Sequence, residues 1–144
     1  MSESLGLVFS EDIDPERFLD VVVALGGVRH PDEWILGRLS RESRHVWIYN
    51  ADPREMEESE VRALEGKLGG VIGTRLILDL SWEEGTEQVV LELVEAAAQR
   101  WHVVVDHLDD RVFTVDELRD RKKSGEPYLF SDPLPPRAVE ETDG

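Results

Sequence analysis

The sequence predicts an α+β fold, with a single mixed β-sheet and helices mainly on one face. Residues 74–81 and 101–106 are short apolar runs rich in β-branched side chains, as is typical of central strands. Residues 83–100, between these runs, place apolar side chains at spacings of three and four, which indicates an amphipathic helix. Turn and capping patterns divide the rest of the chain, and the predicted element order is β-α-β-β-α-β-α-β-β-α.

The N-terminal part of the chain is predicted to form a strand at residues 5–9 and then a helix. Asp14 is a good N-cap, and Pro15 suits the first helical position, where its missing N–H is not needed. Gly26 and Gly27 are expected to end this helix.

A β-hairpin is predicted next, with strands at residues 34–39 and 45–49 and a turn at residues 40–43. In its second strand, aliphatic side chains alternate with His45, Trp47 and Tyr49, so one face of this strand is expected to be aromatic.

Two further helices have recognisable starts. Asp52, followed by proline, predicts the start of a helix that ends at Gly69 and carries several glutamates in its first turns. Ser81 and Glu84 have the spacing of a capping box, which is predicted to begin the helix of residues 83–100. Because this helix would connect two apolar strands, we expect those strands to be parallel neighbours.

The last predicted elements are a strand at residues 111–114 and a helix that ends near Lys123. Thr114 and Glu117 have the spacing of a second capping box for this helix.

The length of 144 residues fits one domain, predicted to span residues 1–130. Residues 131–144 combine prolines with acidic side chains and are expected to form a mobile tail. The absence of cysteine excludes disulfides, thiolate zinc sites and cysteine nucleophiles. The sequence has neither the pattern of a secretory signal nor a long apolar run, so a cytoplasmic protein is expected.

The charge balance is the strongest global feature of the composition. The chain carries 32 acidic against 16 basic residues, a formal net charge of −16. Such a charge repels nucleic acid and anionic membranes, so neither is an expected partner, whereas a basic protein would be attracted. The simpler interpretation is that the excess of acids keeps the protein soluble.

No catalytic motif stands out. Asp79, Asp106, Asp109 and Asp110 are the best group of candidates, because neighbouring parallel strands would bring them to the sheet edge where α/β proteins bind ligands. Their oxygens could hold Mg²⁺, although turn formation and loop hydrogen bonds explain the same residues. We therefore expect no catalytic residue and no cofactor.

Part of the C-terminal half resembles a known class of protein. The segment at residues 75–80, the long helix that ends in Arg100 and Trp101, and the segment at residues 103–118 resemble small bacterial immunity-type proteins of polymorphic or contact-dependent toxin systems. The resemblance covers about 45 residues. It implies a non-enzymatic inhibitor that binds a toxin domain, and no functional residue carries over from it.

The expected function is therefore that of an acidic binding protein, an immunity protein that neutralises a basic toxin domain. An Mg²⁺-dependent enzyme and a self-associating accessory protein, which would be a homodimer instead of a monomer, are the alternatives. The expected partner-binding residues are an aromatic pair and a set of acids: Trp47, Tyr49, Glu55, Glu57, Glu58, Glu60, Asp109 and Asp110.

Overall fold

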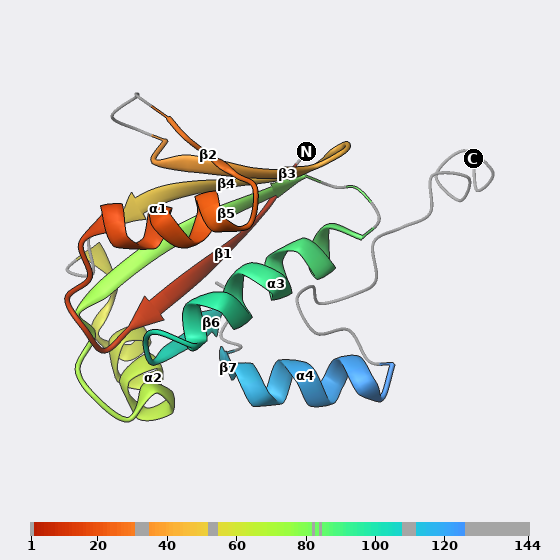
Figure 1. The fold of residues 1–144 in the computed structure, drawn as a ribbon. Helices are drawn as coiled ribbons and strands as arrows, with labels where there is room; N and C mark the ends of the chain where they lie inside the picture. The colour runs from red at the N-terminus through yellow and green to blue at the C-terminus, as the bar shows by residue number, and fades with distance from the viewer. Residues whose placement is uncertain are drawn as a thin grey trace, which may run out of the picture.

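The computed structural model in Figure 1 confirms the α+β class, with four helices and one seven-stranded sheet. It describes residues 2–30, 35–51, 55–81, 83, 85–107 and 112–125. The strand order across the sheet is β2-β3-β4-β5-β1-β6-β7, and all neighbouring strands are antiparallel. The strands are β1 (Ser2–Phe9), β2 (Val28–Arg29), β3 (Gly37–Arg41), β4 (Arg44–Ala51), β5 (Thr74–Ser81), β6 (Val103–Asp106) and β7 (Val112–Thr114).

The helices are α1 (Pro15–Ala24), α2 (Glu58–Leu68), α3 (Thr86–Ala98) and α4 (Val115–Lys123). Two predicted helix starts are confirmed. The Asp14 side chain accepts a hydrogen bond from the Glu16 N–H at the start of α1, and Thr114 and Glu117 form the complete capping box of α4. None of the helices described is long and apolar enough to cross a membrane.

One face of the sheet, here called the first face, carries most of the hydrophobic core. Helices α1 and α3 lie side by side over it, and α4 adds Val115 and Leu118 to the same core. Its side chains alternate along the strands: on β5, Leu76, Leu78 and Leu80 are at most 1% exposed. Strand periodicity therefore directs one row of leucines into the main core.

The opposite face, here called the second face, is covered differently. Helix α2 packs over its β1, β6 and β7 end, where Val8 and Val104 form a smaller apolar cluster with Leu64 and Leu68. On β3, β4 and β5 the second-face side chains are half-buried, and most of them are polar or aromatic, with Ile77 and Ala51 as the aliphatic members. The prediction of helices mainly on one face is thus confirmed, with α2 as the exception.

The prediction that the strands on either side of α3 are neighbours is wrong. Strands β5 and β6 do run in the same direction, but β1 lies between them and pairs antiparallel with both. Strand β1 occupies this central position because both of its faces are buried, Leu5 and Leu7 in the main core and Val8 in the smaller cluster. The sheet is therefore antiparallel throughout instead of mixed.

Two predicted helix starts need correction. Helix α3 begins at Thr86 after Gly85, and the Ser81 hydroxyl instead accepts a hydrogen bond from the His45 N–H at 2.9 Å. Ser81 is the last residue of β5, so its side chain joins the sheet rather than capping the helix. Helix α2 begins at Glu58, six residues after the predicted cap Asp52, which lies outside the described residues together with residues 53–54. The two-residue strand β2 was not predicted.

Candidate functional site

The second face brings chemically distinct side chains into rows that run across the strands. One row consists of Arg38 on β3, Trp47 on β4 and Asp79 on β5, each directly opposite the next. The next row leads from Tyr49 on β4 through Ile77 and Gly6 to Asp106 on β6. The strand register thus joins an aromatic end of this face to an acidic end.

The aromatic end lies on β4. The rings of His45 and Trp47 are 5.4 Å apart between centroids, and Ser40 Oγ lies 2.8 Å from His45 Nδ1. Burial, with a smaller contribution from the negative charge of Asp79, raises the pKa of Tyr49 above its ordinary value. Trp47 and Tyr49 are both half-buried.

The charged side chains beside Trp47 form few polar contacts with the rest of the described chain. Asp79 accepts a hydrogen bond from Ser4 Oγ, and among the described residues neither Asp79 nor Arg38 forms an ion pair. The buried Nε atoms of Arg38 and Arg75 have no hydrogen-bond partner there either. Buried polar groups are usually satisfied, so these guanidinium groups call for an explanation.

The acidic end contains a cavity of about 330 Å³ beneath the start of α2. Asp106 is 5% exposed, and its carboxyl lies over Gly6, where an added Cβ would be 3.7 Å from Oδ2. The cavity combines three carboxylates and one hydroxyl with aliphatic walls, and it is lined by Glu57, Ser59, Glu60, Ala63, Leu64, Asp106 and Val112.

The glutamates at the start of α2 differ in how they are used. Glu58 pairs with Arg62 at 2.6 Å on the helix surface. Glu57 is the N-cap residue, but its side chain makes no capping hydrogen bond, and neither Glu57 nor Glu60 forms an ion pair with another described residue. The positive end of the helix dipole stabilises carboxylates at these positions. These two carboxylates are therefore available to an external cation.

The predicted partner-binding residues fall into two groups. Trp47 and Tyr49 lie together on β4, and Glu57 and Glu60 lie together at the cavity, with the exposed Glu55 and Glu58 near them in sequence. The aromatic pair on β4 lies three strand spacings, about 14 Å, from β6, which carries Asp106 of the cavity. Asp109 and Asp110 lie outside the described residues.

The sequence prediction missed the role of Asp106 as the floor of the cavity, and it missed Arg38 altogether. No local pattern could have revealed either, because both roles depend on which strand lies beside which.

The sheet topology separates the aspartates that were considered as Mg²⁺ ligands. Asp79 and Asp106 both lie on the second face, but β1 separates their strands. Within the described ranges, no three His, Asp or Glu side chains gather closely enough to hold a metal ion.

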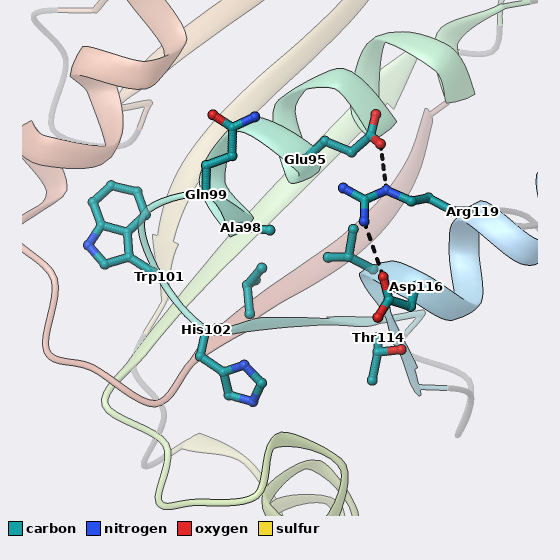
Figure 2. Close-up of a pocket in the computed structure, with 10 residues that line it drawn as sticks. Glu95, Ala98, Gln99, Trp101, His102, Thr114, Asp116 and Arg119 are labelled. Atoms are coloured by element: carbon teal, nitrogen blue, oxygen red, sulfur yellow. Dashed lines mark hydrogen bonds and ion pairs between the residues drawn. The ribbon is translucent and has the colours of Figure 1, made fainter.

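A second cavity, of about 260 Å³, lies between the end of α3 and the start of α4 (Figure 2). Arg119 reaches from α4 to Glu95 on α3, at 2.7 Å, and also pairs with Asp116 at 3.1 Å. The hydrogen bond with Glu95 is the main reason that the pKa of Arg119 is raised. Figure 2 shows the guanidinium held between the two carboxylates, so the charges here join the two helices to each other.

Comparisons of the chain with protein-family models, with curated proteins and with solved structures found no match.

Proposed function

We propose that the chain is a non-enzymatic binding protein that holds a basic protein domain at the acidic cavity of its second face. The observation that carries this proposal is the convergence of Glu57, Glu60 and Asp106 on one cavity of about 330 Å³. An immunity protein that neutralises a basic toxin domain has these properties, and the sequence resemblance described above supports this class.

The lining of the cavity suits a lysine or arginine side chain. Both side chains have an apolar stem and a cationic head, and both tend to bury the stem while the head keeps polar contacts. Ala63, Leu64 and Val112 offer the stem an aliphatic surface, and the carboxylates offer the head charge-assisted hydrogen bonds. The volume lies at the lower end of the range of ligand pockets, about 300–1,000 Å³, which fits one side chain better than a large cofactor.

The surroundings of the cavity favour a macromolecular partner. Glu55 and Glu58 add exposed carboxylates next in sequence to residues that line the cavity, and the whole chain carries a net charge of −16. A field of this size accelerates the association of a basic domain and loses its reach as salt is added. Contacts at the cavity would then determine how long the complex lasts.

The proposal can be tested by titration against a basic toxin domain encoded beside this chain. We expect binding whose association rate falls steeply with ionic strength, and we expect the double variant Glu57→Gln, Glu60→Gln to bind at least tenfold more weakly. The control is Asp12→Asn, Asp120→Asn, which removes the same charge from exposed residues outside the cavity. Equal loss in both double variants would show that only net charge matters, and no binding at low salt would overturn the proposal.

A further inference from the structure

The row Arg38–Trp47–Asp79 on the second face carries an arrangement that the proposed function does not use. Trp47 stands in the middle, with a cation on one neighbouring strand and an anion on the other, each about 4.8 Å away. The three residues are half-buried, and the two charged groups form no ion pair within the described chain. Trp47 lies between Arg38 and Asp79, so the two cannot meet across their own row.

We infer that this part of the second face is a self-association surface, on which a second copy of the chain packs sheet against sheet to form a two-fold symmetric dimer. The inference is independent of the proposed function, because the acidic cavity lies at the other end of the same face.

Symmetry makes the row complementary to itself. A two-fold axis above Trp47, inclined to β4 by about half of the crossing angle of packed sheets, exchanges the β3 side of one copy with the β5 side of the other. Arg38 of each copy then faces Asp79 of the other, and the two Trp47 side chains meet at the axis. In an interface of this isologous kind, residue i contacts j and j contacts i, so one favourable pair occurs twice.

The dimensions are compatible with this arrangement. Packed sheets stand about 10 Å apart, a gap that the side chains of both sheets fill, and their strands cross at about 30°. Helix α2 packs on the β1, β6 and β7 end of the second face. The same axis places β2 of each copy over β1 of the other, level with Ser4 and Leu5 and away from Val8, where α2 packs.

The local charges of the row Arg38–Trp47–Asp79 suit a second copy, while the net charge of −16 on each chain opposes the approach of two copies. A basic partner would meet Arg38 and Arg75 on this part of the face, whereas a second copy brings a carboxylate to Arg38 and a cation to Asp79. An arginine–carboxylate pair that is partly shielded from water forms short, directional hydrogen bonds. It would also stabilise an arginine whose Nε is buried without a partner in the single chain.

Sedimentation velocity of the full-length chain over a range of concentrations tests the inference. We expect a reversible dimer with twice the chain mass. The single variants Arg38→Asp and Asp79→Arg should each shift the dimer dissociation constant at least tenfold upward, because each places like charges opposite one another. The controls Arg17→Asp and Asp12→Arg make the same charge changes at exposed residues outside the row and should leave the dimer unchanged.

Mixing the two single variants provides the sharpest arm of the experiment. In a mixed dimer, the unsubstituted Arg38 of the Asp79→Arg chain faces the unsubstituted Asp79 of the Arg38→Asp chain. The two substituted positions face each other and also have opposite charges. Both pairs are therefore attractive, and the mixture should dimerise although each variant alone is monomeric. Circular dichroism establishes that each variant folds.

A wild-type chain that stays monomeric at every concentration would overturn the inference. So would folded single variants that dimerise as the wild type does, or a mixture that remains monomeric. Association of the wild-type chain only with another protein through Trp47 would also assign the surface to a different occupant and overturn the inference.

Discussion

The two faces of strand β5 differ in how tightly they are packed. On β5, Leu76, Leu78 and Leu80 are almost fully buried beneath α1 and α3, whereas the intervening Arg75, Ile77 and Asp79 are half-buried on the second face. The same eight residues therefore serve a tightly packed core and a polar surface. The difference teaches that strand alternation alone assigns adjacent residues to different roles.

The largest expected effect is a loss of stability, and two neighbouring residues of β5 compare the two faces. Leu78→Ala should destabilise the fold by about 2–5 kcal/mol, because it leaves a cavity in a close-packed core. Ile77→Ala should have a clearly smaller effect, because Ile77 is half-buried on the second face. Urea unfolding of both variants measures the difference. Equal losses of stability would contradict the distinction between the faces.

Two glycines give the next comparison. A Cβ at Gly37 would lie 2.7 Å from Leu19 Cδ2 and 2.9 Å from the Val28 carbonyl oxygen. Gly37→Ala should therefore destabilise the protein by about 1–3 kcal/mol through overpacking.

At Gly6, on the second face, the nearest atom to an added Cβ is Asp106 Cβ at 3.4 Å, an ordinary contact. Thermal melts should show Gly6→Ala nearer to the wild type than Gly37→Ala. The reverse order would mean that the second face is packed as tightly as the first.

Loss of the α4 cap should affect the stability of the protein less than the core substitutions do. Thr114→Ala should lower the free energy of unfolding by about 0.5–2 kcal/mol, because the Glu117 N–H loses its capping acceptor.

Glu117 adds a pH dependence to the same cap. Its pKa is lowered, chiefly by the hydrogen bond from the Thr114 N–H, so the folded state holds fewer protons than the unfolded state near the ordinary value of 4.5. The stability from this group is present above that pH and is lost as the pH falls through the lowered folded value. Denaturant titrations should show a shallower acid loss for Glu117→Gln; an unchanged slope would remove Glu117 from this account.

The smallest expected effect concerns Tyr49 on the second face. Its pKa is raised above 10.0, mainly by burial and secondarily by Asp79. The folded state therefore retains the phenol proton longer, and this stabilising contribution is lost as the pH rises through the folded value. Asp79→Asn should lower the Tyr49 pKa only partly towards 10.0, as followed by phenolate absorbance, with Tyr49→Phe identifying the signal. A complete return would show that charge, rather than burial, dominates at this position.

Local sequence patterns predicted most elements of the fold but not their neighbours in the sheet. The apolar run at residues 74–81 predicted β5, and capping rules placed the starts of α1 and α4 at Asp14 and Thr114. The insertion of β1 between β5 and β6 is a long-range pairing that no local rule contains. Ser81 shows the same limit, because a residue that suits a helix cap was recruited by the adjacent strand.

The candidate site was predicted in parts and not as a whole. The aromatic face of β4 follows from alternation, and the glutamates of α2 follow from their spacing. Their relation to Asp106 and Arg38 could not be predicted, because it depends on the register across the sheet.

Hydrogen exchange of the chain, alone and with the basic toxin domain of the proposed function, tests most directly whether such a partner binds at the second face. The account predicts slower exchange in α2 and in β6 around Asp106, with α1 on the first face unchanged. Protection centred on α1 and α3, with α2 unaffected, would contradict it.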